Sequence, residues 1–289
     1  MRIPLLYATR RPVFSFEFFP PKTEAGYRAL YRTIEELKQL EPAFVSVTSH
    51  ARGENRSKTA ELVIRIQNEL GILAMAHMTC TGQTRAELGA TLTELARAGI
   101  ENVMALRGDP PQDQPDWRPV PGGFRYGSEL AAFVKSLGTF AIGGGCYPEV
   151  HPEAASAEAD LANLKRKLEA GVEFLITQLF LDNRHYFRFV ERARAAGITV
   201  PIVPGIMPIV SLQNLRGAMR NAPTSETPRE LEHSLASAED DKERSLAIGV
   251  EWATGQCREL LARGAPGIHF YTLNQSPATR RVHGNLVAG

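Results

Sequence analysis

The sequence predicts an α/β fold in which residues 1–289 form a single (β/α)8 barrel domain, the TIM-barrel architecture. Short runs of β-branched and aromatic residues alternate with longer amphipathic segments, as expected for βα units that build a parallel sheet. Eight such runs occur, which is the number of strands that closes this barrel. The length of the chain also suits one barrel, and no linker to a second domain is visible.

The predicted strands are short, apolar and followed by polar or glycine-containing segments. In chain order they cover residues 13–19, 44–49, 73–80, 102–108, 140–146, 174–181, 202–207 and 267–273. Because each is separated from the next by a longer segment, we expect parallel rather than hairpin pairing.

Amphipathic helices are predicted between these strands, and several end in a glycine that favours a left-handed C-terminal cap. They cover residues 26–40, 56–70, 85–99, 159–171, 185–197 and 244–264. Two segments depart from the alternation. Residues 110–123 form a Pro/Gly/Asp-rich loop, and residues 221–243 are a polar, Pro/Ser/Glu-rich stretch that predicts a mobile excursion.

Composition narrows the class of partner. Lys and Arg number 33 against 32 for Asp and Glu, so no overall basic field favours nucleic acid or membrane binding. The cysteines Cys80, Cys146 and Cys257 are far apart and form no CxxC pair, which argues against disulfides and a cysteine-based zinc site. No secretory leader pattern and no run of about 18 apolar residues is present. We expect a cytoplasmic protein that recognises a small molecule.

Polar side chains fall systematically at the carboxyl ends of the predicted strands, where TIM barrels carry their active sites. We therefore expect them to converge on one rim of the barrel. They are Glu17, Thr48, His77, Asp109, Tyr147, Gln178, Tyr271 and Asn274.

Local sequence allows two interpretations of Glu17 and of His77, and it favours a structural interpretation of Asp109. Glu17 lies among aromatic residues in FSFEFFPP, which predicts a raised pKa and an acid role, but a buried Glu paired with an arginine fits equally well. Local sequence favours Asp109 in LRGDPP as a turn residue before proline. His77 in MAHMTC could bind a metal with Cys80, yet a neutral, hydrogen-bonded histidine is more common there, so we predict no metal.

The segment YPEVHPEAASAEADLANLKRK combines cationic and hydrogen-bonding groups at helical spacing. Asn163, Arg166 and Lys167 fall on one side of the helix and could hold a pyrophosphate, although a charged helix face is more often only solvated. No GxGxxG motif follows a strand, which disfavours a Rossmann dinucleotide site.

Taken together, the motifs resemble the methylenetetrahydrofolate reductase family over nearly the whole chain. The motifs, in order, are SFEFFPPK, FVSVTS, AHMTC, ALRGDPP, YPEVHPEA, DLANLKRK, ITQLF, PGIMPI and HFYTLN. The resemblance implies a barrel with FAD as cofactor that reduces 5,10-methylenetetrahydrofolate to 5-methyltetrahydrofolate. It implies NADH or NADPH as the donor, a ping-pong cycle in which both substrates use one flavin face, and a homo-oligomer.

The resemblance also assigns roles to residues. Glu17 matches the general acid, Asp109 the aspartate near the pterin and the flavin, and Gln178 the glutamine shared by both substrates. Residues matching the cofactor site are Thr48, Ala51, His77, Arg107, Gly108, Asp109, Tyr126, Gly127, Tyr147, His151, Ala154, Asp160, Asn163, Arg166 and Lys167. Residues matching the substrate site are Gln178, Asn214, Tyr271 and Gln275.

The chain departs from the family pattern at Ser49, where tyrosine is common, and in HARGENRS, which replaces a glycine-rich loop. Asn214, Ala218 and Gln275 also differ from the residues usual at their positions. Two alternatives stay open beside the reductase. The protein could run mainly as a 5-methyltetrahydrofolate oxidase or take electrons from a protein donor, or it could be a non-catalytic flavin- or folate-binding subunit, which the presence of Glu17, Asp109 and Gln178 disfavours.

Overall fold

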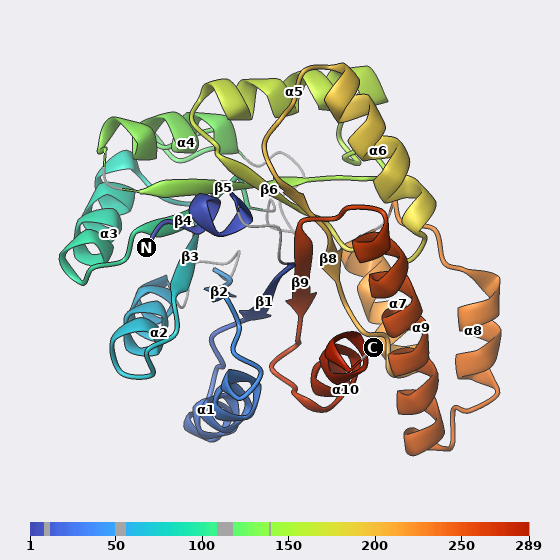
Figure 1. Cartoon of the computed structure of the whole chain (residues 1–289). Helices are drawn as coiled ribbons and strands as arrows, with labels where there is room; N and C mark the ends of the chain where they lie inside the picture. The colour runs from blue at the N-terminus through green and yellow to red at the C-terminus, as the bar shows by residue number, and fades with distance from the viewer. Residues whose placement is uncertain (9–11, 50–55, 109–117, 139, 223, 289) are drawn as a thin grey trace.

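A computed structural model describes residues 1–8, 12–49, 56–108, 118–138, 140–222 and 224–288 of the chain. Within these ranges, strands in a single parallel sheet are surrounded by helices (Figure 1). The strands are β1 (Val13–Phe18), β2 (Phe44–Val47), β3 (Ala74–Thr79), β4 (Asn102–Leu106), β5 (Ala141–Cys146), β6 (Phe174–Thr177), β7 (Ile202–Val203), β8 (Gly205–Ile206) and β9 (Gly267–Tyr271).

The sheet closes into a barrel through a strand that is divided in two. β7 pairs with β6, and β8 pairs with β9, which in turn pairs with β1. Pro204 separates β7 from β8 because it has no N–H to give to the ladder, but its carbonyl accepts from the His269 N–H at 3.0 Å. Counted as one strand, β7 and β8 correspond to predicted residues 202–207, and the predicted eight-stranded barrel is confirmed.

The six predicted helices are also confirmed, with ends shifted by a few residues. They are α1 (Glu24–Lys38), α2 (Arg56–Asn68), α3 (Arg85–Arg97), α5 (Ala157–Glu169), α6 (Asn183–Ala195) and α9 (Lys242–Ala262). Gly99, Gly171, Gly197 and Gly264, which follow four of them, have the positive φ expected of helix caps. Among the described residues, none of the helices has the combined length and apolarity needed to cross a membrane.

Among the described residues, five further helical segments lie outside these six predicted ranges. They are the 3₁₀ helix η1 (Ile3–Ala8), α4 (Gly127–Ser136), α7 (Leu212–Asn221), α8 (Arg229–Ala236) and α10 (Pro277–Val287). α8 lies within the polar segment 221–243 and buries Leu231 and Leu235 completely. These two leucines pack with residues of α7 in a small separate core, and α8 runs along the outer side of α9 (Figure 1).

The interior of the barrel changes character along its axis. At the amino ends of the strands it is apolar, with Ile3, Val13 and Phe174 in one buried cluster. The backbone N–H of Ile3 donates to Asn102 at 2.8 Å and so holds η1 against this end of the barrel. Further along β1, Ser15 and Glu17 take the inward positions because side chains of a strand alternate between its two faces. The carboxyl half of the interior is therefore polar.

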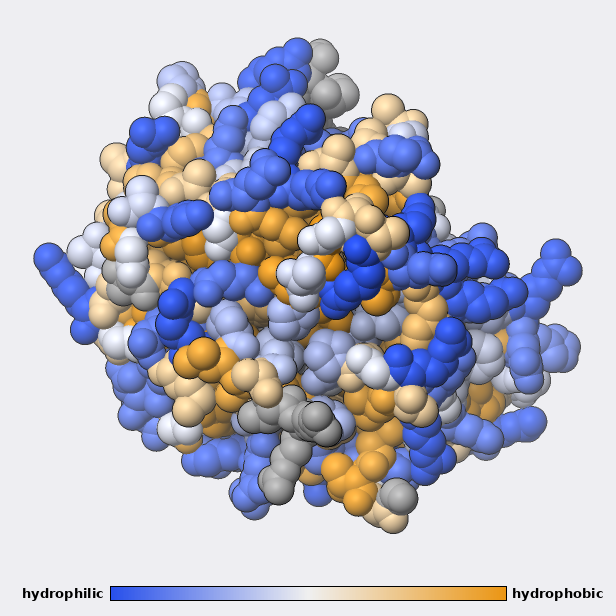
Figure 2. Space-filling model, turned by 45° about the horizontal axis from the view of Figure 1, so that its top comes forward, coloured by the Kyte–Doolittle hydropathy of each residue, from blue (hydrophilic) through white to orange (hydrophobic). Residues whose placement is uncertain are grey.

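Hydrophobic and hydrophilic residues are unevenly distributed over the surface. On the face shown in Figure 2, hydrophilic residues lie around most of the periphery and hydrophobic residues gather in a central area. Within the described residues, the large hydrophobic side chains that are exposed, such as Leu5, Leu137 and Val287, come from separate elements of the chain.

His283 on α10 predicts a loss of stability in mild acid. Its ring meets Phe14 and Phe16 edge-on at 4.8 and 6.4 Å, and burial lowers its pKa. The unfolded chain therefore binds more protons below the ordinary histidine pKa of about 6.5, so the free energy of unfolding should fall as the pH drops from there. Urea unfolding between pH 7 and pH 5 should show a shallower decline for His283→Leu than for the wild type. An equal decline in both would contradict this role.

Candidate functional site

Four strands bring polar side chains together inside the carboxyl half of the barrel. Glu17 on β1 lies at the centre, and all contacts to its side chain are made by Oε2. Ser46 Oγ on β2 and His269 Nε2 on β9 each lie 3.3 Å from this oxygen, and His77 Nε2 on β3 lies 3.4 Å away. Within the described residues, no hydrogen bond or ion pair reaches Oε1. One carboxylate oxygen is thus held, and the other is available for a ligand.

The predicted raised pKa of Glu17 is wrong. Burial raises it, but the electrostatic effects of His77 and His269 and the hydrogen bonds from His269 and Ser46 together outweigh burial, and the net effect lowers the pKa of Glu17. The sequence prediction assumed that the aromatic neighbours surround the carboxyl group. Phe16 and Phe18 instead occupy the opposite face of β1, in the core between strands and helices.

His77 fits only part of the expectation of a neutral, hydrogen-bonded histidine, because its buried Nε2 makes no hydrogen bond within the described residues. Its side chain is 6% exposed, and burial lowers its pKa in spite of the nearby Glu17 carboxylate. Of the described residues, no group of three or more His, Cys, Asp or Glu side chains is arranged to hold a metal ion.

His269 is a site residue that the sequence analysis missed. It is completely buried, and its Nδ1 lies 2.7 Å from Ser15 Oγ. When Ser15 donates to Nδ1, the ring proton lies on Nε2 and can be donated to Glu17 Oε2. The signal was the pattern of inward-facing polar residues at alternate positions, Ser15 and Glu17 on β1 and His269 and Tyr271 on β9.

The residues expected to bind substrate lie at the same rim but differ in how they are held. Tyr271 donates its hydroxyl to the Thr177 carbonyl at 2.6 Å, and burial raises its pKa well above the ordinary value. Gln178 Oε1 accepts from the Leu179 N–H at 2.8 Å, and Asn214 Oδ1 accepts from the Val210 N–H at 3.2 Å. Gln275 is exposed.

Asn274, which the sequence also places at this rim, has a structural role. Its side chain bridges the backbone of Phe19, accepting from the N–H at 3.0 Å and donating to the carbonyl at 2.8 Å. Asn274 therefore fixes the end of β1, immediately after Glu17.

The residues expected to bind the cofactor cluster beyond β4 and β5. Lys167 on α5 is partly buried, and its Nζ donates to the Gly145 carbonyl at 2.9 Å. Arg107 forms a two-pronged ion pair with Glu153 at 2.5 and 2.7 Å. The rings of Tyr147 and His151 meet edge-on at 4.5 Å. Burial and, after it, the charge of Arg107 lower the pKa of His151.

Other residues expected to bind the cofactor hold the backbone around this region in place. Asp160 accepts from the His151 N–H at 3.0 Å, and the Ala154 N–H donates to the His151 carbonyl at 2.9 Å. Gly127 permits α4 to begin against the end of β4, since a Cβ at this position would lie 3.1 Å from the backbone nitrogen of Arg107. Tyr126 precedes it as the N-cap residue.

The remaining residues expected to bind the cofactor are more exposed, or they lie outside the region beyond β4 and β5. Arg166 donates to Asn163 at 2.6 Å on the solvent side of α5, and Gly108 has a φ of +82°. The Thr48 carbonyl accepts from Thr59 Oγ1 at 3.1 Å. The two remaining predicted residues, Ala51 and Asp109, lie outside the described residues.

The chemistry of this region fits FAD. Lys167 and Arg107 supply two cations close enough for each charge to affect the other, as a diphosphate requires. The carboxylate of Glu153 already occupies the fork of the Arg107 guanidinium, which shows that this fork accepts an anion. Tyr147 and His151 offer ring surfaces beside these cations.

Comparisons with known proteins show which family and which fold this chain resembles. The family described as "Methylenetetrahydrofolate reductase" matches residues 2–287. The 5,10-methylenetetrahydrofolate reductase of Pectobacterium carotovorum is 38% identical over 91% of this chain and 86% of its own. Methylenetetrahydrofolate reductase (NADH) 1 of Arabidopsis thaliana is 39% identical over 90% of this chain, which spans 46% of that longer relative.

A solved structure from Clostridium thermocellum shares the fold. It has a TM-score of 0.64 and 14% sequence identity, and the match covers 97% of this chain and 96% of that one. It is described as an uncharacterized protein that binds two copies of 5-methyl-5,6,7,8-tetrahydrofolic acid. At this identity the similarity concerns the architecture.

Proposed function

Since this chain belongs to the methylenetetrahydrofolate reductase family, we propose that it reduces 5,10-methylenetetrahydrofolate to 5-methyltetrahydrofolate with NADH or NADPH as donor and FAD as cofactor. The observation that supports this proposal most strongly is the Glu17 carboxylate at the mouth of the barrel. Its Oε2 is hydrogen-bonded to Ser46 and His269 and lies 3.4 Å from His77 Nε2, and its Oε1 is available to a substrate nitrogen. An acid held in one orientation is what opening of the folate's five-membered ring requires.

Glu17 would carry the reacting proton on Oε1. The lowered pKa favours the carboxylate in the free protein, so the acid role requires substrate binding to raise this pKa and the solvent to supply the proton. A bound pterin would remove water from the carboxyl group, and this desolvation raises the pKa toward the protonated form. Ser46 and His269 would keep Oε2 in place during the transfer.

The cofactor would lie beyond β4 and β5. When bound, FAD would carry the electron pair from the nicotinamide to the folate. Lys167 and Arg107 would hold its diphosphate, and Tyr147 and His151 would flank it. Release of Arg107 from Glu153 would accompany binding. Because both substrates would use one face of the cofactor, Gln178 and Tyr271 would contact each in turn, as a ping-pong cycle requires.

The visible absorbance spectrum of the purified protein with added FAD tests this function. We expect a bound flavin band that disappears on anaerobic addition of NADH or NADPH and returns on addition of methylenetetrahydrofolate. The donor that bleaches the band faster identifies the preferred nicotinamide. A bound flavin that neither nicotinamide bleaches would refute the donor assignment, and no flavin uptake would refute the cofactor.

A further inference from the structure

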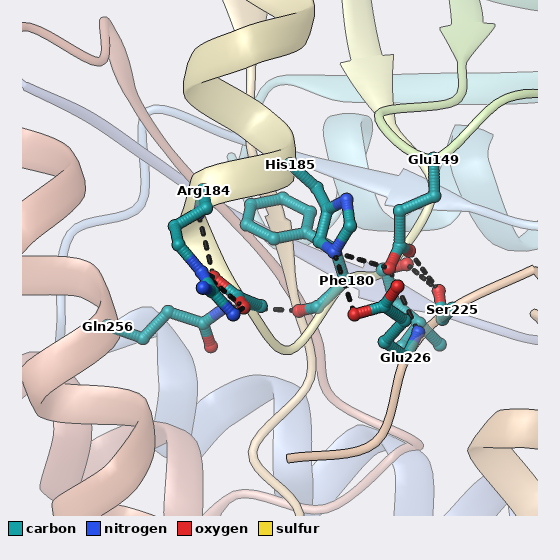
Figure 3. Close-up of polar contacts among 9 residues, drawn as sticks. Glu149, Phe180, Arg184, His185, Ser225, Glu226 and Gln256 are labelled. Carbon is teal, nitrogen blue, oxygen red and sulfur yellow. Dashed lines mark hydrogen bonds and ion pairs between the residues drawn. The ribbon is translucent and has the colours of Figure 1, made fainter.

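Glu149 is a buried carboxylate that the proposed reaction does not use. It follows β5 in the YPEVHPEA motif, between Tyr147 and His151, and its side chain is only 5% exposed. Its two oxygens point to a segment far along the chain (Figure 3). Ser225 Oγ donates to Oε2 at 2.5 Å, and the Glu226 N–H donates to Oε1 at 2.9 Å. A buried carboxylate with both oxygens bonded to one segment forms a firm connection to it.

His185, near the start of α6, completes the connection. Its Nε2 lies 3.6 Å from Glu149 Oε1 and 3.4 Å from Glu226 Oε2, between the two carboxylates (Figure 3). Without a group between them, these two like charges would repel each other. We call Glu149, His185, Ser225 and Glu226 the Glu149 clamp.

The backbone next to Glu149 is strained. Val150 has a φ of +73°, a region that β-branched residues rarely adopt. Such a conformation persists only where surrounding contacts hold it, and strained residues cluster at functional sites. Glu149 contacts the clamp residues, whereas Tyr147 and His151, two residues before and two residues after it, form the edge-on ring pair of the cofactor region.

The other end of the clamp belongs to the substrate side. Ser225 and Glu226 lie between α7 and α8, and the Ser225 N–H donates to the Ala222 carbonyl at 2.9 Å, just past the end of α7. Ser225 Oγ also lies 3.1 Å from the carbonyl of Leu179, the residue after Gln178. α7 carries Asn214 in its first turn, and its buried residues belong to the same hydrophobic cluster as Leu179, against which Tyr271 packs. The clamp thus joins the cofactor-side loop to the helix beside the folate position.

We propose that Glu149 is a positioning residue that couples the cofactor-side loop, residues 147–154, to the substrate-side segment, residues 224–228, so that occupation of one side by its ligand organises the other. The ligand classes rest on the proposed function, but the mechanical connection does not. Coupling of this kind is reciprocal, because each ligand changes the affinity of the other by the same factor.

Hydrogen exchange of the full-length protein without ligands tests the connection. Ser225→Ala should raise amide exchange about tenfold in residues 147–154, and Glu149→Gln should do so in residues 224–228. Glu191→Gln removes one carboxylate from the exposed side of α6, where it contacts no clamp residue, and serves as the charge-matched control. Thermal unfolding checks that each variant is folded. If Ser225→Ala alters only its own segment, the coupling proposal is wrong.

Ligand affinities provide the second measurement. Ser225 lies on the substrate side, so a merely local defect there would not affect the cofactor, whereas coupling predicts that Ser225→Ala weakens FAD binding at least about fivefold. The same variant should weaken binding of 5-methyltetrahydrofolate by a comparable factor. Unchanged FAD affinity would overturn the proposal. Failure of the proposed function would look different, because the wild type itself would bind no FAD, and the exchange measurement would still decide on the clamp.

Discussion

Replacing Glu17 with glutamine should lower the rate of methylenetetrahydrofolate reduction by roughly 10²–10⁴-fold, the usual contribution of a positioned general acid. Glutamine keeps the shape of the side chain and one oxygen to accept from Ser46, but it cannot donate an acidic proton. Oxidation of the nicotinamide by bound flavin should persist, because that half-reaction needs no proton from this residue. Stopped-flow absorbance of each half-reaction measures the two effects separately.

Glu35→Gln provides the control for this experiment. Glu35 lies on the exposed face of α1, so this substitution makes the same chemical change outside the barrel. Flavin affinity should be the same in both variants and in the wild type. A Glu17→Gln protein that reduces the folate at the wild-type rate would exclude Glu17 as the acid. Equal loss of both half-reactions would instead indicate damage to the cofactor site.

Replacing Gly249 with alanine should lower the free energy of unfolding by about 3 kcal/mol or more, the upper end of overpacking effects. Glycine to alanine inside a helix normally stabilises by up to about 1 kcal/mol. Here a Cβ would lie 1.9 Å from the backbone oxygen of Ile209, so either α9 or the segment leading into α7 has to move. Backbone cannot yield as a flexible side chain can.

Gly255 lies in the same helix and provides a direct comparison, because alanine at this position should stabilise the protein whereas alanine at position 249 should destabilise it. A Cβ at Gly255 would have no atom within 4 Å, so Gly255→Ala should raise the free energy of unfolding. Urea unfolding of both variants at one pH gives the comparison. Destabilisation by both substitutions, or by neither, would show that close packing at Ile209 does not limit this position. Displacement of α7 should also weaken folate binding in Gly249→Ala.

Sequence patterns predicted the barrel well because its strands and its larger helices have clear periodicity. Four predicted helix-ending glycines have the expected backbone conformation, and Glu17 lies at the predicted end of β1. Patterns failed for short or weakly periodic elements. α10 begins with Pro277, and α8 is hidden in a polar stretch with only Leu231 and Leu235 fully buried.

The electrostatics of the site could not be predicted from neighbours in the chain. The residues beside Glu17 in sequence point away from it, and those that set its pKa come from three other strands. Only the register of the closed sheet places His269 level with Ser15 and next to Glu17. Glu149 was overlooked for a similar reason, because its partners lie 76 and 77 residues further along the chain.

The division of the barrel interior into an apolar half and a polar half has a consequence for engineering. Substitutions among Val13, Met75, Met104 and Phe174 would alter the stability of the protein while leaving the groups that surround Glu17 in place. A library confined to that apolar half could therefore raise heat resistance without a trade-off in turnover. Conversely, substitutions at the carboxyl ends of the same strands could be used to change the substrate range, because the apolar half of the barrel would still stabilise the fold.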